Sequence, residues 1–239
     1  MKRYIIIILL FFPVCWLTAQ NRQVVVEAVA GEDLSEKVAP QIQYVFPDFT
    51  DGDVYFSGMP KSGGKLNYNM LVGEMQFLDN NGKILALANV KNVVFININD
   101  RKFYPFNETE FAEELASIGT CFLRVRYKGN IAQHSKKGAY GTSSSTSSIT
   151  SYSSISDGSR MHDLTVEEKV LITVNRLFYL VGLDGKYQLI TNIKPFVKRF
   201  PEYKTLIENF VSENKTRFDN ADDLKALLEY CGLLKSVTK

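Results

Sequence analysis

The residues best suited to acid–base or nucleophilic chemistry flank a serine- and threonine-rich stretch, residues 138–160. His134 precedes this stretch, and His162 with Asp163 follows it. Together with a serine, these side-chain types could form a hydrolase triad. The spacing argues against a triad, because the chain has no G-x-S-x-G elbow and a histidine is not oriented by the aspartate directly next to it. A hydrolase around His134 and His162 is therefore the weakest of three functional hypotheses.

Three aspartates and one glycine-rich segment resemble ligand motifs but have the wrong spacing. Asp48, Asp51 and Asp53 do not follow the calcium-loop pattern D-x-[DN]-x-[DN]-G, and a turn explains them. Segment 61–65, KSGGK, lacks the Ser or Thr that follows the lysine of a phosphate loop, and it leads into a predicted strand. We therefore expect neither a metal nor another cofactor.

Aromatic residues are the candidates for ligand binding. They recur on the apolar segments of the first half of the chain, and on a curved sheet they could line a pocket for a small apolar ligand. The alternative is that they fill the core of a β-sheet domain. The candidate ligand-binding residues are Tyr44, Tyr55, Tyr68 and Phe77.

Two cysteines, Cys121 and Cys231, lie beyond the first 19 residues. An oxidising compartment would permit a disulfide between them. The alternative is two separate buried thiols, which we favour because a chain of this size can build a large core without a disulfide.

The first 19 residues have the composition of a secretory leader. A basic start (MKR) is followed by an apolar run over residues 4–16 and by a cleavage site, LTA, before Gln20. The run is shorter than the ~20 residues of a membrane-spanning helix, and Cys15 is not preceded by the small residues expected before a lipidated cysteine. We expect export to the periplasm, to the outer membrane or out of the cell, without a later transmembrane segment.

The charge balance changes when this leader is removed. Taking its two basic residues from the 28 of the chain leaves 26, equal to the 26 acidic residues. A neutral chain lacks the net basic surface of a nucleic-acid-binding protein, so no nucleic acid is expected. The rest of the chain fits one domain, with a β-sheet part over residues 20–191 and a helical cap over residues 192–239.

Residues 65–106 organise the β-sheet part. Apolar and polar residues alternate, as they do in a half-buried strand, and turn-forming pairs such as Asn81-Gly82 separate the runs. Such short links cannot hold parallel crossovers, so we expect five successive strands in an antiparallel meander. The predicted strands cover residues 66–70, 75–77, 84–87, 93–98 and 103–106.

Further segments add to the predicted sheet, among them a first strand over residues 23–30 and an extended run over residues 54–56. Residues 41–46 are expected to form a strand, and residues 170–190 a hairpin with Asp-Gly at its turn. Residues 107–117 fit either a capped helix or a strand that turns back at Gly119. We prefer the hairpin, because a clear strand follows the glycine.

The C-terminal part changes to a helical period. Apolar residues at i, i+3, i+4 and i+7 predict three short amphipathic helices, beginning near Ile193, at Pro201 and after Asn220. Their apolar faces must pack against one another and against the sheet. Gly232 is expected just past the end of the last helix.

Three segments carry a resemblance to other proteins: LNYNMLVGEMQFLD at residues 66–79, KKGAYGTSSSTSS at residues 136–148, and DDLKALLEY at residues 222–230. With them the chain resembles a group of uncharacterised exported proteins of Gram-negative bacteria. The resemblance implies an exported β-rich domain with a helical C-terminus. It implies no reaction and no site residue.

The fold class follows from these elements. We expect an α+β fold, with an antiparallel meander or open barrel of about eight to ten strands and C-terminal amphipathic helices. The leading functional hypothesis is a non-catalytic envelope protein with a binding or structural role, whose partner is another envelope protein. The second is a carrier that holds a small apolar ligand in the curved sheet.

Overall fold

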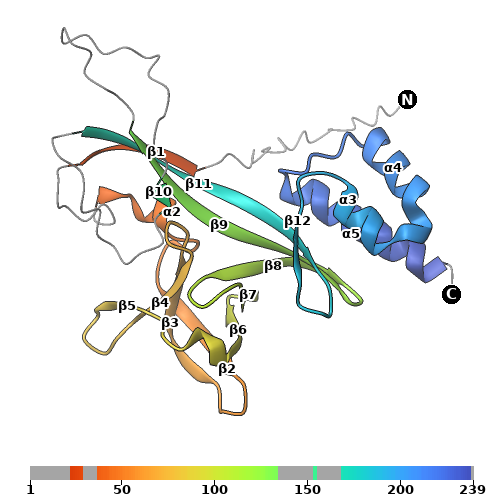
Figure 1. The fold of residues 1–239 in the computed structure, drawn as a ribbon. Helices are drawn as coiled ribbons and strands as arrows, with labels where there is room; N and C mark the ends of the chain where they lie inside the picture. The colour runs from red at the N-terminus through yellow and green to blue at the C-terminus, as the bar shows by residue number, and fades with distance from the viewer. Residues whose placement is uncertain (1–21, 29–36, 134–152, 155–167, 238–239) are drawn as a thin grey trace, which may run out of the picture.

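The computed structural model describes residues 22–28, 37–133, 153–154 and 168–237. In this α+β fold a twelve-stranded antiparallel sheet stays open, and helices pack on one part of it (Figure 1). The predicted fold class is thereby confirmed. The strand order is β1-β11-β9-β8-β7-β6-β2-β3-β4-β5, with β10 beside β9 and β12 beside β11.

The elements have the following bounds. The strands are β1 Arg22–Ala28, β2 Thr50–Phe56, β3 Ser62–Asn69, β4 Glu74–Leu78, β5 Ile84–Ala86, β6 Val93–Ile98, β7 Arg101–Pro105, β8 Phe111–Ile118, β9 Cys121–Gln133, β10 Ser153–Ser154, β11 Glu168–Val181 and β12 Tyr187–Leu189. The helices are α2 Pro40–Gln43, α3 Lys194–Arg199, α4 Lys204–Glu213 and α5 Ala221–Val237, with 3₁₀ turns η1 Val90–Asn92 and η2 Pro201–Tyr203.

The prediction of five successive neighbouring strands is wrong at one point. β5 and β6 do not pair, because β2 lies between β3 and β6. β2 places Val54 opposite Ile96 on one face of the sheet and Tyr55 opposite Phe95 on the other. Such apolar cross-strand pairs stabilise β6 on both faces, whereas β5 is short and leaves its Ile84 exposed.

Two ambiguous segments are settled by the structure. β8 turns at Gly119, which has a φ of +55°, and pairs with β9, so the predicted hairpin is confirmed. The strand predicted over residues 41–46 is wrong, because Pro40 starts the helical turn α2. Proline suits the first helical position, where its missing N–H is not needed. Only Tyr44 joins the sheet, through an isolated bridge to Asn69.

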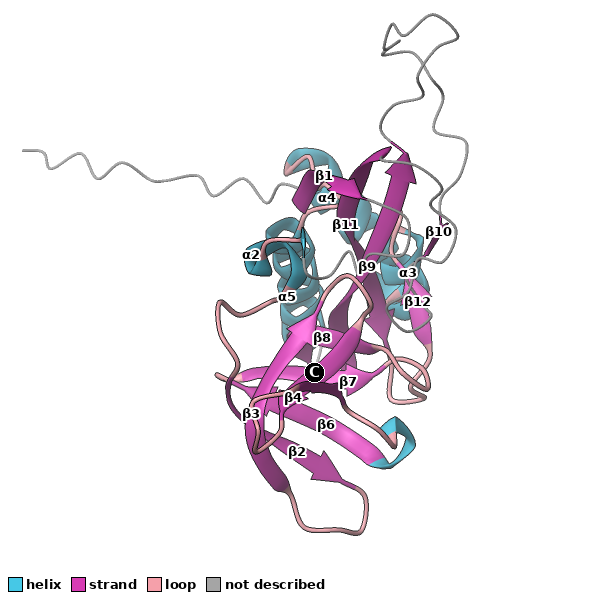
Figure 2. Ribbon diagram, turned by 90° about the vertical axis from the view of Figure 1, so that its left-hand side faces the viewer, coloured by secondary structure: helices cyan, strands magenta, loops and turns pink. Residues whose placement is uncertain are grey.

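A long ribbon of β9 and β11 divides the molecule into two packed regions. In the register of this pair, Gly129 lies opposite Val174 and Val125 lies opposite Phe178, all on the same face. One end of this face packs against strands β2–β8, and the other end packs against α3–α5. Figure 1 shows the helices at one end of the ribbon, and Figure 2 shows the strands of the meander below it.

The first region, called the meander core here, is rich in aromatic residues. Tyr68 is fully buried, stacks on Phe103 at 5.3 Å between ring centroids, and donates a 2.7 Å hydrogen bond to the carbonyl of Phe111. The β3–β4 turn reaches the ribbon at Gly129, where an added Cβ would lie 2.3 Å from the carbonyl oxygen of Leu71. The core consists mainly of Phe46, Val54, Leu66, Tyr68, Met70, Met75, Ile96, Ile98, Phe103, Phe111, Ile172 and Val174.

The second region, called the helix core here, is almost wholly apolar. The predicted helices are present, but Gly232 lies inside α5 and not past its end. The glycine is needed for close packing, because an added Cβ would lie 2.5 Å from the side chain of Ile118. The core consists mainly of Cys121, Leu123, Val125, Phe178, Leu180, Ile190, Phe196, Phe200, Ile207, Leu224, Leu227, Leu228 and Cys231.

Candidate functional site

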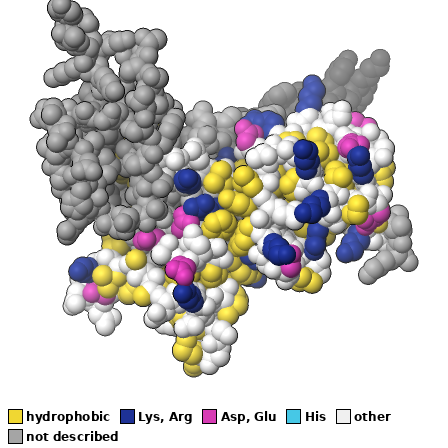
Figure 3. Space-filling view, viewed as in Figure 1, with side chains coloured by type: hydrophobic (Ala, Val, Ile, Leu, Met, Phe, Trp, Pro, Cys, Tyr) yellow, Lys and Arg dark blue, Asp and Glu magenta, His cyan; other side chains and the backbone are white. Residues whose placement is uncertain are grey.

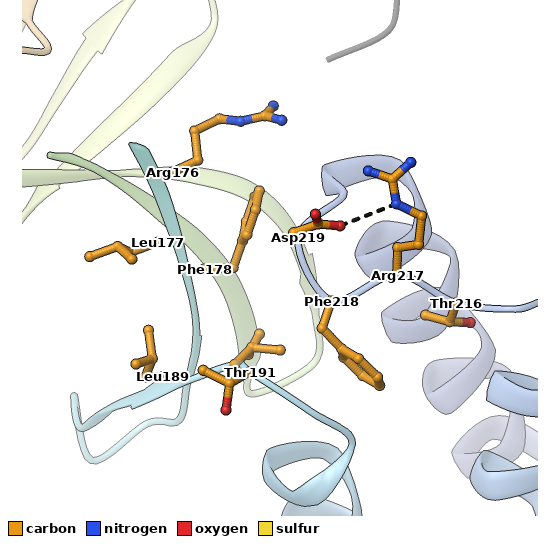
Figure 4. A pocket seen from close by; sticks show the side chains of 10 residues that line it. Arg176, Leu177, Phe178, Leu189, Thr191, Thr216, Arg217, Phe218 and Asp219 are labelled. Carbon is orange, nitrogen blue, oxygen red and sulfur yellow. Dashed lines mark hydrogen bonds and ion pairs between the residues drawn. The ribbon is translucent and has the colours of Figure 1, made fainter. Parts of the chain in front are cut away.

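A groove with a volume of about 540 Å³ opens between the sheet and the helices. This volume is within the range of small-molecule sites. Three separate parts of the chain line it: β11, the end of β12 and the loop between α4 and α5 (Figure 4). The lining residues are Arg176, Leu177, Phe178, Leu189, Ile190, Thr191, Thr216, Arg217, Phe218 and Asp219.

The strand pairing places the groove at an interval in the edge of β11. β9 occupies one edge of β11, so β1 and β12 share the other edge, where they pair with residues 168–174 and 179–181. The end of β12 is fixed by the Ile190 N–H, which donates a 2.8 Å hydrogen bond to the carbonyl of Phe178. The groove therefore begins beside residues 175–178 of β11, which lie between the segment paired with β1 and the segment paired with β12.

The loop between α4 and α5 forms the opposite wall. Thr216 N–H donates to the carbonyl of Val211 at 3.1 Å, and Lys215 has a φ of +50°, which turns the chain sharply after α4. Asn220 then caps α5, because its side-chain oxygen accepts hydrogen bonds from the N–H groups of Asp222 and Asp223. These contacts fix the two ends of the intervening segment, residues 216–219, between α4 and α5.

The groove is apolar along its wall and charged at one end. Phe178 and Ile190 form a buried apolar surface. The guanidinium groups of Arg176 and Arg217 lie at the same end, with the Asp219 carboxylate between them (Figure 4). Arg217 Nε is 3.2 Å from Asp219 Oδ1, and the Arg176 guanidinium lies 5.6 Å from the ring centroid of Phe178.

This composition fits binding better than proton transfer. The ionisable groups of the lining are two arginines and one aspartate, and arginine stays charged at all physiological pH values. Guanidinium groups bind carboxylates and phosphates through charge-assisted hydrogen bonds. The groove therefore suits a ligand with an apolar body and a negatively charged group.

A second feature, which we call the aromatic–arginine ladder, lies on the face of the sheet opposite to the two cores. Tyr55 stacks on Phe95 at 4.3 Å, and the guanidinium of Arg124 lies 3.7 Å from the ring centroid of Tyr104. Figure 3 shows a band of hydrophobic side chains over the middle of the sheet. The ladder consists of Tyr55, Phe95, Tyr104, Phe106, Arg124, Arg126, Tyr179 and Tyr187.

The arginines of this ladder form ion pairs with acidic residues of the same chain. Arg124 pairs with Glu114 at 3.5 Å and Arg126 pairs with Glu110. The Nε atoms of both arginines are buried without a hydrogen-bond acceptor among the described residues, and the neighbouring rings offer cation–π contacts instead. We therefore assign the ladder a stabilising role on the open sheet face.

A buried acidic residue in the meander region is also fully engaged. Glu113 accepts two 2.6 Å hydrogen bonds from Arg101 and a 2.8 Å hydrogen bond from the hydroxyl of Tyr127. Burial is the main cause that raises the pKa of Tyr127, and the negative charge of Glu113 adds to it. The tyrosine consequently stays protonated and keeps donating this hydrogen bond.

The four aromatic residues predicted to bind a ligand do not lie together. Tyr68 fills the meander core and Phe77 packs against it. Tyr44 lies beside Phe49 and donates a 2.9 Å hydrogen bond to Gln76. Tyr55 belongs to the ladder on the opposite face.

The other predicted residues lie elsewhere. Cys121 and Cys231 are free thiols buried in the helix core. His134 and His162 lie outside the described residues. Within the described residues, no cluster of three or more His, Cys, Asp or Glu side chains is placed to hold a metal ion. Nor does any helix in that part of the chain have the length and apolar character needed to span a membrane.

Two of the three aspartates considered for calcium form ion pairs on the β2–β3 hairpin. Asp51 contacts Lys65 at 2.8 Å and Asp53 contacts Lys61 at 2.7 Å. Both lysines belong to the KSGGK segment that superficially resembles a phosphate loop. The two lysines therefore neutralise the charges of Asp51 and Asp53 across the hairpin.

No family model, curated protein or solved structure matches this chain. The groove was not predicted from the sequence, because its walls come from three separate segments, and the loop at residues 216–219 meets the hairpin at residues 176–178 and 189–191 only in the folded protein. One sequence signal points to it: Arg176 is a lone charged residue within the apolar run 170–181.

Proposed function

We propose that this chain is an exported, non-catalytic protein of the cell envelope that binds a small amphipathic anion in the groove between β11, β12 and the α4–α5 loop. The groove carries the proposal, because it combines a buried apolar wall with two guanidinium groups at one end. The leader-like first 19 residues support export.

The alternative of a ligand enclosed by the curved sheet has less support. Tyr68 and Phe103 occupy the inner face and are fully buried against each other. A ligand at this place would have to displace packed aromatic rings, whereas the groove is already open to solvent.

Native mass spectrometry of the mature protein, purified from its own compartment, tests the proposal. We expect an additional mass of a few hundred daltons that is lost on denaturation, as a small ligand of the groove's size requires. Isolation of the bare chain alone would contradict ligand binding. A stoichiometric complex with another protein would instead favour a role as a partner-binding envelope protein.

Two matched substitutions locate the ligand. Arg217→Gln removes a charge at the groove, and Lys204→Gln removes the same charge from the exposed start of α4, outside the lining. We expect Arg217→Gln to weaken binding about tenfold, because one charge-assisted contact is lost, and Lys204→Gln to leave it unchanged. Equal effects of the two substitutions would place the ligand elsewhere.

A further inference from the structure

We propose that Cys121 and Cys231 become joined by a disulfide that fastens α5 to the β8–β9 hairpin in the exported protein. The inference rests on the proposed export, because disulfides persist in oxidising compartments and are rare in the cytosol. Cys15 belongs to the predicted leader, so these two cysteines are the only ones in the expected mature chain.

The packing of α5 brings the two thiols close together in the helix core. Cys121 begins β9 and lies opposite Ile118 of β8. Gly232, the residue after Cys231, packs directly on that isoleucine, where an added Cβ would lie only 2.5 Å from two of its carbon atoms. A disulfide needs Cα atoms about 4.4–6.8 Å apart, and a glycine at this contact permits the close approach of helix and hairpin.

The surroundings of the thiols agree with this proximity. Both side chains are buried in the helix core, with exposed fractions of 2% for Cys121 and 0% for Cys231. Burial and the neighbouring Cys121 raise the pKa of Cys231 to about 12, and burial also raises the pKa of Cys121. The folded, reduced protein therefore offers few thiolates and little access to an oxidant.

The bridge must then form before α5 docks. The thiolate of one cysteine attacks an external disulfide, which acts as the oxidant, and forms a mixed disulfide. The second cysteine, as its thiolate, attacks the cysteine sulfur of that bond and releases the oxidant as a dithiol. The chain loses two protons and two electrons, and the oxidant gains them.

Intact mass after thiol blocking tests the bridge. The mature protein is isolated with an alkylating reagent present from lysis onwards and is denatured without reductant. We expect a mass about 2 Da below that of the dithiol, no alkylated cysteine, and two adducts once reductant is added before alkylation. Two adducts without reductant, or a bridge between two chains, would overturn the proposal.

A refolding experiment tests the bridge independently of export. Purified reduced protein is exposed to oxidised glutathione either while folded or while refolding from denaturant, with Cys231→Ala as the control that cannot close the bridge. We expect formation at least about tenfold faster during refolding. Failure of the refolding chain to lose 2 Da overturns the bridge, whereas recovery of a leader-bearing chain from the cytoplasm overturns only the proposed export.

Discussion

The meander core and the helix core pack on the same face of the β9–β11 ribbon, yet they are built differently. The meander core combines stacked aromatic rings with a directed polar contact, since Tyr68 bonds to the Phe111 carbonyl, and Glu113 and Arg101 form an ion pair at its border. The helix core relies on apolar side chains at helical spacing. In this molecule the meander strands are fixed by pairing register and by directional contacts, whereas the amphipathic helices are placed mainly by the fit of apolar surfaces.

The two cores also differ in how closely the backbone approaches the ribbon. In the meander core, Gly129 meets backbone atoms of Leu71, and in the helix core, Gly232 meets the side chain of Ile118. Backbone cannot move aside as a side chain can, so the same glycine-to-alanine change tests how rigid each contact is.

The largest effect is expected for Gly129→Ala. Its new Cβ would lie 2.3 Å from Leu71 O and 2.8 Å from Leu71 Cα, so the β3–β4 turn must withdraw from the ribbon. We expect a loss of about 3 kcal/mol or more in the free energy of unfolding, at the upper end of overpacking effects. Urea unfolding monitored by circular dichroism measures it, and a loss below about 1 kcal/mol would show that the turn is not held there.

Gly232→Ala should lower the free energy of unfolding by less than Gly129→Ala does. Ile118 can rotate away, and alanine favours the helix over glycine by about 1 kcal/mol, which offsets part of an overpacking cost of about 1–3 kcal/mol. We expect a net loss of about 1 kcal/mol in the same urea assay. Combining it with Ile118→Ala should relieve the clash, so the double variant should be more stable than the sum of the single effects predicts. Strict additivity would contradict direct contact.

The smallest effect concerns Glu74, at the point where β4 bridges to Glu110. Burial and the negative charge of Glu110 raise the pKa of Glu74 above 4.5. A raised pKa favours the protonated form in the folded protein, so this contribution to stability is present below about pH 4.5 and is lost as the pH rises through the folded value. Glu74→Gln should therefore stabilise the protein at pH 7, by less than about 1 kcal/mol because solvent screens a half-buried site.

Thermal unfolding across pH checks this sign. The advantage of Glu74→Gln over the unaltered protein should shrink as the pH falls toward 4. Glu213→Gln, at the exposed end of α4, removes the same charge and should show no such trend. A constant advantage for Glu74→Gln at every pH would rule out the titration of this carboxyl as its cause.

Local patterns were sufficient to predict most strands and all three C-terminal helices. Alternation over residues 66–77 and the helical period after Ile193 depend on neighbouring residues, and both were confirmed. Pairing between distant segments was not predictable in this way. Nothing in the local sequence of β5 shows that β2, and not β5, lies beside β6.

The glycine of α5 and the groove illustrate the same limit. Gly232 fits a helix end by its type, but a long-range contact with Ile118 determines its place inside α5. The groove depends on how three segments meet in space, so only the lone Arg176 could have drawn attention to it. The local amino-acid sequence specifies local structure, whereas tertiary packing determines which distant residues each side chain contacts.

The pairing of β1 with β11 has a consequence for the order of folding. Arg22 lies opposite Val174, about 150 residues later, so β1 has no partner until most of the chain is available. Contacts this distant in sequence slow folding, because a long loop must close before the pairing is gained. The N-terminal strand is therefore expected to pair late, and a chain that is translocated N-terminus first would leave this segment unpaired until β11 has followed.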